Sequence, residues 1–447
     1  MISSGQKIAV MGLGVSGRAA VKYALLCGAA VRVSDVRSKD QFFAEEGHFL
    51  KETGVEWEAG GHTVSFLRWA EIAIVSPGIN IETPLFTELR GAGITIAGEL
   101  AIAADCINVP VVAVTGTNGK TTVTTLIGNL LEGAGKKVFV GGNIGTPLFE
   151  YLCTPGDVEY VVAEVSSFQL ECCGDFSPDI AVLLNVTPDH LDRHLNMEKY
   201  FQAKKQLFRN LGKGKTAILN NDDSLCNQLQ CPPGTELLFF GKTKNCTASL
   251  QGDSVIVSRK GRKEVFDLQG TAFTGTIGVQ NCGAAILAAS SLGCSTEQIN
   301  NVINEFKPLP HRLQFVIRKN GISYYNDSKA TNTGAVVAAL EHFDNSVVLI
   351  AGGRDKGDDY RLLRDSIVNK VVQVVTIGEA ANLLEDALSD IVPVVRAETM
   401  KEAVHKATQS CDKGTVLLSP ACASFDMFQS YGHRGREFMR EVLDLCG

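Results

Sequence analysis

The segment Thr115–Thr122, with the sequence Thr-Gly-Thr-Asn-Gly-Lys-Thr-Thr, constrains the fold of this chain more than any other. It follows the apolar run Val111–Val114, which predicts a buried strand, and it precedes Val123–Leu131, which predicts a helix. A strand, a glycine loop, Lys-Thr and a helix form the arrangement that cradles the phosphates of nucleoside triphosphates. The backbone N–H groups of such a loop and the helix N-terminus face the anion. We therefore predict a nucleotide-binding site in this segment.

Within the loop, we expect Lys120 to contact the outer phosphates and the hydroxyl of Thr121 to hold Mg²⁺. The match to the general pattern is imperfect, because that pattern has a further glycine at the position of Val114. The glycines here are Gly116 and Gly119, which make the loop shorter. The alternative is a glycine turn with an incidental lysine, but Lys and Thr together at a helix start favour phosphate binding.

Length and composition exclude several classes of protein. A chain of 447 residues predicts roughly three domains of about 150 residues each. The net charge is −7, and the densest basic cluster, residues 259–263, lies between two strand-like segments, which favours a solvated hairpin tip over a nucleic-acid surface. The 13 cysteines are scattered, without a Cys-x-x-Cys pair or a preceding signal peptide, which indicates reduced thiols. No apolar run reaches the length of about 18 residues that a membrane span requires. We therefore expect a cytoplasmic protein that binds neither nucleic acid nor a membrane.

Residues 1–98 predict a Rossmann-like domain. The strand Lys7–Met11 leads into Gly-Leu-Gly-Val-Ser-Gly at 12–17, and a second strand ends at Asp35. In this G-x-G-x-x-G fingerprint a diphosphate lies at a helix N-terminus, and an acidic residue about 20 positions on contacts a ribose hydroxyl. The pattern does not distinguish NAD from another ribosyl diphosphate, and ordinary α/β packing is the alternative. A second turn, at 76–80, is expected at the same edge of the sheet.

Two further α/β domains follow, so the predicted fold is a three-domain α/β chain. Residues 99–308 carry the glycine loop and near-continuous apolar strands, which are typical of a parallel sheet covered on both faces, as in a P-loop ATPase-like domain. Residues 243–275 alternate instead and predict a small antiparallel patch. Residues 309–447 repeat the α/β alternation and predict a second Rossmann-like domain. Its predicted strands are Ile322–Tyr325, Val347–Ala351, Val371–Ile377 and Val416–Ser419.

Polar side chains follow two strands of the predicted central sheet. Glu164 ends the strand 160–163, and the turn Thr187–Asp192 follows the strand 180–186. Ligands of open α/β sheets bind at the carboxyl ends of strands, so a lysine, a carboxylate and a histidine turn are expected to meet beside the glycine loop. These groups suit Mg²⁺-ATP.

The histidine turn has a second interpretation. Asp189, His190, Asp192 and His194 have a spacing that resembles a zinc cluster. Without further Cys or His ligands, an ordinary loop is favoured over zinc, and we interpret His194 as incidental.

Taken together, these motifs resemble the Mur ligase family, whose members build the peptide of bacterial cell-wall precursors, and the resemblance covers essentially the whole chain. It rests on Gly-Thr-Asn-Gly-Lys-Thr, on Gly141–Gly145, on Asn326–Asn332 and on Ser419–Asp426. Asn118 stands where the L-alanine-adding members typically have His, and the Asp-Asn-Pro-Arg motif of the diamino-acid-adding members is absent. Within the family, the motifs are similar to those of the D-glutamate-adding branch.

The resemblance implies roles for the matching residues. Those implied in ATP binding are Gly116, Thr117, Asn118, Gly119, Lys120, Thr121, Thr122, Asn281, Arg312 and Asp327, with His311 flanking the nucleotide. The implied contacts of a UDP-linked substrate are Val15, Ser16, Asp35, Arg37, Gly78 and Asn143, and those of D-glutamate are Thr331, Lys356, Ser424, Phe425 and Tyr431. The residues implied in catalysis are Lys120, Glu164, His190 and Lys204. 

Two Mg²⁺ sites are implied as well. Thr121 and Glu164 resemble the ligands of the first, and His190 with a carbamylated Lys204 resembles the second. The sequence alone gives no reason to prefer Lys204 to Lys205. At two further positions, Gln280 and Ala284, this chain departs from the family's adenine-contacting pattern of His and Asn.

The implied activity is an ATP-dependent ligation of a carboxylate to an amine. D-Glutamate is added to UDP-N-acetylmuramoyl-L-alanine through an acyl phosphate and a tetrahedral intermediate, which gives ADP and phosphate. We expect a monomer whose domains close on a shared cleft, with hinges near residues 98 and 308. The nearest alternative is a sister Mur-type or folylpolyglutamate-type ligase that adds another amino acid. An NAD-dependent oxidoreductase explains neither the glycine loop nor the third domain, and a non-catalytic regulator would lack Lys120, Glu164 or His190, which are all present.

Overall fold

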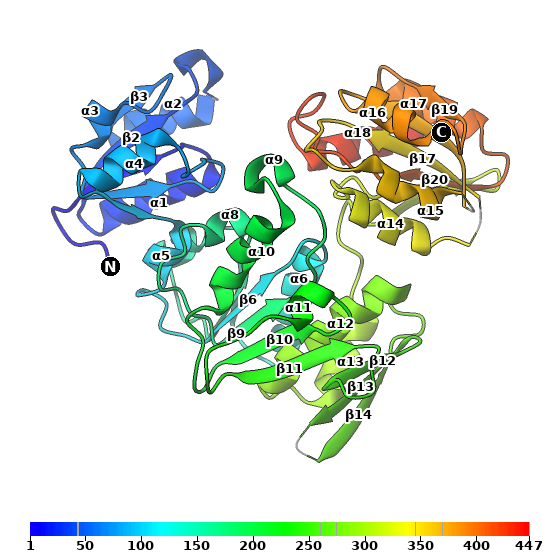
Figure 1. The fold of residues 1–447 in the computed structure, drawn as a ribbon, viewed down its shortest axis with the longest axis horizontal. Coiled ribbons are helices and arrows are strands. Elements are labelled where there is room, and N and C mark those ends of the chain that lie inside the picture. The colour runs from blue at the N-terminus through cyan, green and yellow to red at the C-terminus, as the bar shows by residue number, and fades with distance from the viewer. Residues whose placement is uncertain (43, 260, 274, 345, 369, 447) are drawn as a thin grey trace.

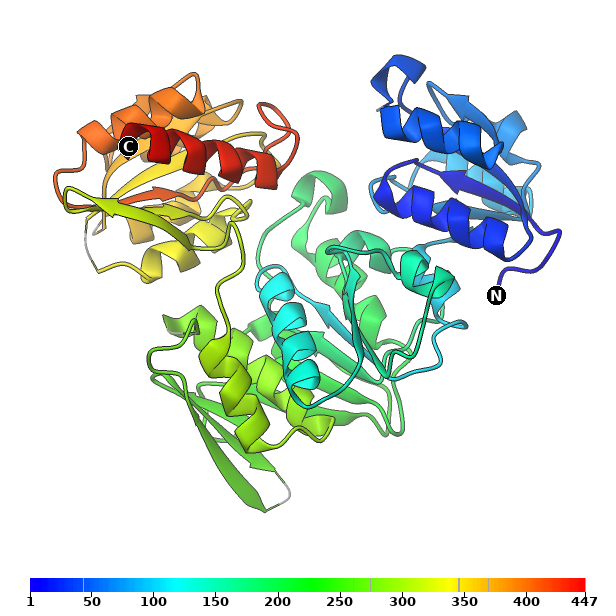
Figure 2. The same ribbon diagram turned by 180° about the vertical axis from the view of Figure 1, so that it is seen from behind.

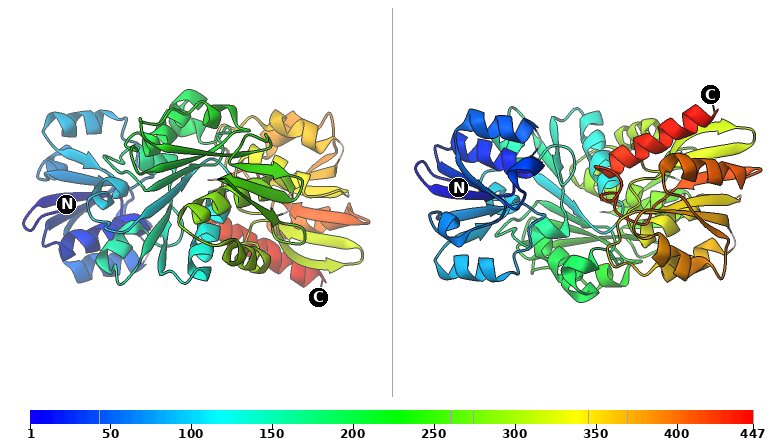
Figure 3. Two further views of the ribbon diagram at one scale, coloured as in Figure 1. Left: turned by 90° about the horizontal axis from the view of Figure 1, so that it is seen from below. Right: turned by 90° about the horizontal axis from the view of Figure 1, so that it is seen from above.

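The computed structural model describes all residues except 43, 260, 274, 345, 369 and 447. Three sheets divide the chain into an N-terminal, a central and a C-terminal α/β domain, which confirms the predicted fold class (Figure 1). The N- and C-terminal domains both lie against one end of the central domain, and views from below and above place them at opposite ends of the molecule's long axis (Figure 3). None of the helices in the described ranges is both long enough and apolar enough to cross a membrane.

The N-terminal sheet has five parallel strands in the order β3-β2-β1-β4-β5. Its elements are β1 (Lys7–Met11), α1 (Val15–Leu26), β2 (Ala30–Asp35), the 3₁₀ turn η1 (Lys39–Gln41), α2 (Ala44–Thr53), β3 (Glu56–Ala59), α3 (Val64–Leu67), β4 (Ile72–Val75), α4 (Pro84–Gly91) and β5 (Thr95–Ala97). The strand order reverses between β1 and β4, so the loops that follow them meet, and the Ser76 hydroxyl donates to the Gly12 carbonyl at 3.1 Å. A Cβ atom on Gly17 would lie 1.8 Å from that carbonyl oxygen, so the close approach of α1 requires glycine there.

The central sheet has nine strands in the order β14-β13-β12-β11-β10-β9-β6-β8-β7. Its first elements are α5 (Glu99–Ala103), β6 (Val111–Thr115), α6 (Lys120–Gly133), β7 (Val138–Gly142), α7 (Leu148–Cys153), β8 (Tyr160–Glu164), α8 (Ser167–Leu170), β9 (Ile180–Leu183), α9 (Leu191–His194), α10 (Met197–Lys205) and η2 (Gln206–Phe208). They are followed by β10 (Thr216–Asn220), α11 (Ser224–Asn227), β11 (Glu236–Gly241), β12 (Ala248–Gln251), β13 (Ser254–Arg259), β14 (Arg262–Asp267), α12 (Gly275–Ser291) and α13 (Thr296–Glu305). Every residue of β6 is buried, because β8 and β9 flank it and helices cover both faces.

Two expectations about this domain are refined. The predicted antiparallel patch is present as β12, β13 and β14, and it continues the parallel sheet through β11. The predicted hairpin tip joins β13 to β14, with Lys260 outside the described residues. The strand expected over 180–186 ends at Leu183, because the carbonyl of Asn185 instead accepts the backbone N–H of Thr117 in the glycine loop.

The C-terminal sheet has six strands in the order β15-β16-β20-β17-β18-β19. Its elements are β15 (Gln314–Lys319), β16 (Ile322–Asn326), α14 (Thr333–Glu341), β17 (Val347–Gly352), η3 (Tyr360–Leu363), α15 (Arg364–Ile367), β18 (Val371–Ile377), α16 (Ala381–Leu388), β19 (Val394–Arg396), α17 (Met400–Gln409), β20 (Gly414–Leu418) and α18 (Tyr431–Cys446). The four predicted strands are present, and the edge strands β15 and β19 were not predicted. β15 is antiparallel to β16, and α18 runs across the domain at its outer surface (Figure 2).

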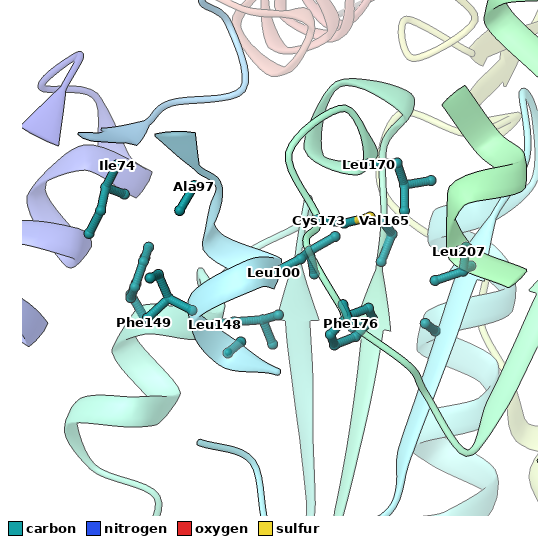
Figure 4. Packing of buried hydrophobic residues seen from close by; sticks show 14 of the residues in the cluster. Ile74, Ala97, Leu100, Leu148, Phe149, Val165, Leu170, Cys173, Phe176 and Leu207 are labelled. Carbon is teal, nitrogen blue, oxygen red and sulfur yellow. The ribbon is translucent and has the colours of Figure 1, made fainter. Parts of the chain in front are cut away.

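The N-terminal and central domains share one buried apolar cluster (Figure 4). Ile74 and Ala97 from the N-terminal sheet belong to it together with Leu148 and Phe149 of α7. Glu99, the first residue of α5, is buried beside this cluster, where it accepts hydrogen bonds from the Phe149 N–H at 3.1 Å and from Nε2 of Gln169 at 3.2 Å. Burial raises the pKa of Glu99 to about 7, although both hydrogen bonds oppose the rise.

We expect Glu99→Gln to change how stability depends on pH. Because its pKa in the folded state lies above its usual value, the folded protein binds this proton more readily than the unfolded chain does. The free energy of unfolding of the parent should therefore fall, relative to that of Glu99→Gln, by roughly 1–3 kcal/mol between about pH 5 and pH 7.5. Urea denaturation at several pH values measures this difference. Glu45→Gln, on the exposed side of α2, is the control, and an equal trend in both variants would contradict the prediction.

Candidate functional site

The glycine loop connects β6 to α6, as predicted. Gly116 and Gly119 adopt φ angles of 151° and 88°, and a Cβ atom on Gly119 would lie 2.3 Å from Oδ1 of Asn281. Glycine is therefore required where α12 packs on the loop. The Nζ atom of Lys120 donates to the carbonyl oxygens of Gly116 at 3.0 Å and Thr117 at 2.8 Å, so its ammonium group lies over the loop. Burial lowers the pKa of Lys120.

Asn185 holds the loop from the neighbouring strand end, a role that the sequence analysis did not predict. Its Oδ1 accepts the backbone N–H groups of Thr117 at 3.1 Å and Asn118 at 2.8 Å. Its Nδ2 donates to the Asn118 carbonyl at 3.0 Å. The available signal was its position directly after an apolar strand, at the edge where the loop was expected.

Oxygen ligands suited to a divalent cation gather at the start of α6. The Thr121 hydroxyl donates to Oε2 of Glu164 at 2.7 Å, and Nδ2 of Asn143 donates to Oε1 of the same carboxylate at 2.7 Å. A hydroxyl and a carboxylate beside a phosphate-binding loop form the kind of hard oxygen set that Mg²⁺ prefers. The chemistry of these donors therefore fits the predicted Mg²⁺ contacts of Thr121 and Glu164.

The histidine turn reaches the same edge of the sheet. His190 has a left-handed backbone with φ 56°, and its N–H donates to Oδ1 of Asp189 at 2.9 Å. Burial lowers the pKa of His190 to about 4, with Lys120 and Lys204 adding to the effect and Asp189 opposing it. The imidazole is therefore neutral at pH 7, the form that ligates metals. The rings of His190 and His194 both pack against Phe168, and Nε2 of His194 lies 3.0 Å from the Ser167 hydroxyl oxygen. The interpretation of His194 as incidental stays a prediction.

Lys204 and Lys205, which the sequence could not tell apart, have different surroundings in the structure. Lys204 is 1% exposed, and its Nζ donates to the Gly116 carbonyl at 2.8 Å. The same Nζ lies over the Tyr200 ring, 4.3 Å from the ring centroid. Burial and the charge of Lys120 lower the pKa of Lys204 well below its usual value. Lys205 lies over Phe201 instead and is partly exposed. Lys204 is thus a buried amine directed at the glycine loop, with a pKa below that of an exposed lysine.

The C-terminal domain contributes three further groups to this site. Nζ of Lys329 donates to the Thr121 hydroxyl at 2.7 Å, and burial lowers the pKa of Lys329 to about 7. Arg312 is partly buried near the charges of Glu164 and Asp327, and within the described residues its Nε atom has no hydrogen-bond partner. Burial raises the pKa of Asp327 to about 7, while the Leu313 N–H and the Ser419 hydroxyl both bond to it.

A cavity of about 400 Å³ lies between the central and C-terminal domains. Its polar lining includes six of the residues predicted to bind ATP, namely Asn118, Gly119, Thr122, Asn281, Arg312 and Asp327. Its apolar lining includes Phe273, Phe306, Phe315 and Tyr325. An apolar space that opens beside a phosphate-binding loop has the character expected of a nucleoside pocket.

The predicted D-glutamate residues lie on loops of the C-terminal domain, except Tyr431, which begins α18. Lys356 forms an ion pair with Asp189, which places it beside the His190 turn. Ser424 is buried, whereas Phe425 and Tyr431 are 66% and 40% exposed. The buried Arg434, which was not predicted, donates to the carbonyl oxygens of Ser328 at 2.9 Å and Cys422 at 3.0 Å. Arg434 therefore ties the loop that carries Thr331 to the loop that carries Ser424.

The predicted UDP-substrate residues lie at the switch point of the N-terminal sheet, apart from Asn143. Val15 and Ser16 begin α1, and Val15 is exposed. Asp35 is buried, and its carboxylate accepts the Leu13 N–H at 2.7 Å and hydrogen bonds from Arg37. Those hydrogen bonds lower the pKa of Asp35 against the opposing effect of burial. In this structure Asp35 thus fixes the glycine turn. 

The turn that carries Gly78 connects this domain with the central domain. The carbonyl of Gly78 accepts from Nη1 of Arg193 at 3.4 Å, which joins the second turn to α9. Asn143 lies on the central domain, where it contacts Glu164.

Three models of known domains match the chain in succession. The Mur ligase MurD-like N-terminal domain matches residues 6–98, the Mur ligase middle domain matches 114–289, and the Mur ligase glutamate ligase domain matches 311–422. The chain is 47% identical over 438 residues to the UDP-N-acetylmuramoylalanine–D-glutamate ligase of Desulfotalea psychrophila, covering 98% of this chain and 96% of the relative. The chain belongs to the Mur ligase family. It is also 41% identical over 442 residues to the ligase of the same name from Koribacter versatilis, covering 98% of this chain and 97% of that protein.

Solved Mur ligase structures share the fold. MurC from Thermotoga maritima superposes with a TM-score of 0.62 at 20% identity, covering 98% of this chain and 99% of MurC. MurF from Acinetobacter baumannii gives a TM-score of 0.63 at 17% identity, covering 98% of this chain and 91% of MurF. At these identities the comparison concerns the three-domain architecture alone.

The two departures from the Mur ligase adenine pattern have different surroundings. Gln280 faces outward, and its Nε2 donates to Asp222 at 3.4 Å. Ala284, one turn after Asn281, is fully buried in the apolar cluster between α12 and the sheet. A small apolar side chain at this position fills the core, so Asn281 is the member of the pattern that faces the glycine loop.

Proposed function

We propose that this Mur ligase is an ATP-dependent ligase that joins D-glutamate to the alanyl carboxyl group of UDP-N-acetylmuramoyl-L-alanine, with release of ADP and phosphate. The observation that carries the proposal is the full-length identity of 47% to a ligase of that name. The arrangement of Lys120, Glu164 and His190 at one edge of the central sheet, facing the C-terminal domain, supports it.

The chemistry follows from the properties of the carboxyl group. A carboxylate is a poor electrophile, and transfer of the γ-phosphoryl group gives an acyl phosphate whose leaving group is phosphate. The amine of D-glutamate then attacks the acyl carbon, and the tetrahedral intermediate collapses to the amide and phosphate. The glycine loop and Lys120 would orient the triphosphate and offset its charge. Arg312 from the C-terminal domain would contact the nucleotide when the domains are closed.

Two Mg²⁺ ions are part of the proposal. Thr121 and Glu164 would hold the first, and His190 with Lys204 the second. Bound Mg²⁺ would offset the charge of the transferring phosphoryl group. A buried neutral amine reacts with CO₂, forming an N–C bond and releasing a proton, and the resulting carbamate of Lys204 would give the second site an oxygen ligand.

The remaining assignments are proposals of the same kind. The domain limits are 1–98 for the UDP substrate, 99–308 for ATP and 309–447 for D-glutamate. Val15, Ser16, Asp35, Arg37, Gly78 and Asn143 would contact the UDP substrate, and Thr331, Lys356, Ser424, Phe425 and Tyr431 would contact D-glutamate. The protein would act as a cytoplasmic monomer.

Dependence of ADP release on both substrates tests the function. We expect release only when UDP-N-acetylmuramoyl-L-alanine and D-glutamate are both present with Mg²⁺-ATP. A panel of amino acids that includes L-glutamate, L-alanine and a diamino acid separates this activity from that of a sister ligase. Equal turnover without D-glutamate, or faster turnover with another amino acid, would contradict the proposal.

A further inference from the structure

Asn332, the N-cap residue of α14, connects that helix with the glycine loop and the His190 turn across the interface between the C-terminal and central domains. Its side chain is 3% exposed. Its Nδ2 donates to Oδ1 of Asn118 at 3.1 Å and to Oδ2 of Asp189 at 2.9 Å. Its Oδ1 accepts from the Ala335 N–H at 2.8 Å and from Nδ2 of Asn118 at 3.3 Å. Both donors and both acceptor positions of this buried amide are therefore used.

We propose that Asn332 is a positioning residue that couples closure of the C-terminal domain to the geometry of the glycine loop and the His190 turn. The proposal rests on the proposed function, because it assigns these two segments to the reaction. Asn118 lies in the glycine loop, and Asp189 precedes His190. One side chain of the C-terminal domain thus holds both segments of the central domain.

The backbone of His190 explains why such support matters. A left-handed conformation is costly for a residue other than glycine and persists where the surroundings hold it. Asp189 supplies part of this support, because its Oδ1 accepts the His190 N–H at 2.9 Å. Asp189 is itself held by two groups of the C-terminal domain, Asn332 and Lys356. Opening of the C-terminal domain would remove both of these partners from the Asp189 carboxylate.

The plainest alternative is that Asn332 only caps α14. A cap needs one acceptor, and Ser, Thr or Asp would serve as well. Thr399 caps α17 of the same domain in this way, through a hydrogen bond from the Glu402 N–H at 3.2 Å. Capping does not account for the two hydrogen bonds that Nδ2 of Asn332 donates to the other domain.

Asn332→Ser separates the two roles, since serine keeps a capping oxygen and removes the amide donors. We expect its Tm to stay within about 2 °C of the parent value. The KM values for ATP and D-glutamate should rise by about tenfold, whereas the Kd of the UDP substrate should not change. Small-angle X-ray scattering without nucleotide should give a larger radius of gyration than for the parent.

Three further variants complete the test. Asn332→Ala removes both the cap and the amide donors. Asn332→Asp keeps the cap but places a carboxylate against Asp189, so its KM values and radius of gyration should exceed those of Asn332→Ser. Thr399→Ser changes a cap remote from the interface and should match the parent in every measurement. Parent-like KM values and scattering for Asn332→Ser would overturn the proposal, as would a Tm loss equal to that of Asn332→Ala with unchanged KM. If the parent does not use D-glutamate but the radius of gyration of Asn332→Ser is still larger, the proposed function fails. The proposed coupling of domain closure to the glycine loop and the His190 turn then still holds.

Discussion

Lys120→Met is expected to lower kcat for ADP release by about a thousandfold or more. The ammonium of Lys120 lies over the glycine loop, where it meets the carbonyl groups of Gly116 and Thr117 and where phosphate charge would accumulate. Methionine keeps most of the side-chain volume and removes the charge, so the loss reports electrostatics more than packing. The expected readout is the rate of ADP release at saturating concentrations of all three substrates.

Binding of the UDP substrate is the internal control for this variant. Val15 and Ser16, the predicted contacts, lie on the N-terminal domain, so calorimetric titration of Lys120→Met with the UDP substrate should give the parent Kd. Lys213→Met removes an exposed lysine of the central domain, which also carries Lys120, and should retain full turnover. Comparable turnover of Lys120→Met and Lys213→Met would exclude a catalytic role for the loop lysine.

Much of the fold could be predicted, because short apolar runs indicate its buried strands and glycine turns indicate where those strands end. β6, β8 and β18 are short runs rich in Val, and their burial in parallel sheets is what such runs indicate. β15 was not predicted, because its sequence, Gln-Phe-Val-Ile-Arg-Lys, is polar at both ends and lies at an edge. β19 is only three residues long, too short to show a period.

Parts of the site could be placed from strand ends alone. Glu164 ends β8, Lys120 and His190 follow β6 and β9, and parallel strands bring their carboxyl ends to one edge of the central sheet. Lys204 and Asn332 could not be placed from residue patterns. Neighbouring lysines on a helix point about 100° apart, and only packing of α10 beside the loop decides which one turns inward. The partners of Asn332 belong to another domain, and residue patterns do not predict how two separate sheets are placed relative to each other.

The second large effect is expected for Lys204→Ala, which should lower kcat by about a hundredfold or more. Its Nζ is buried and lies 2.8 Å from the Gly116 carbonyl oxygen, and burial favours the neutral amine that can take up CO₂. Loss of the carbamate would remove an oxygen ligand from the proposed second Mg²⁺ site. Because the alanine variant also leaves a space beside the loop, acetate or formate should restore part of the turnover.

Isotope-labelled bicarbonate gives a readout that does not depend on turnover. The parent should show one carbamate signal by carbon NMR, and the signal should be absent in Lys204→Ala. Lys205→Ala is the matched control, because Lys205 is the next residue of α10 but lies over Phe201 and is partly exposed. It should keep both the signal and a kcat within about threefold of the parent, as expected for a surface position. Lys204 Nζ meets the Gly116 carbonyl and Lys205 does not, so equal losses of turnover in the two variants would contradict the proposed metal-binding role of Lys204.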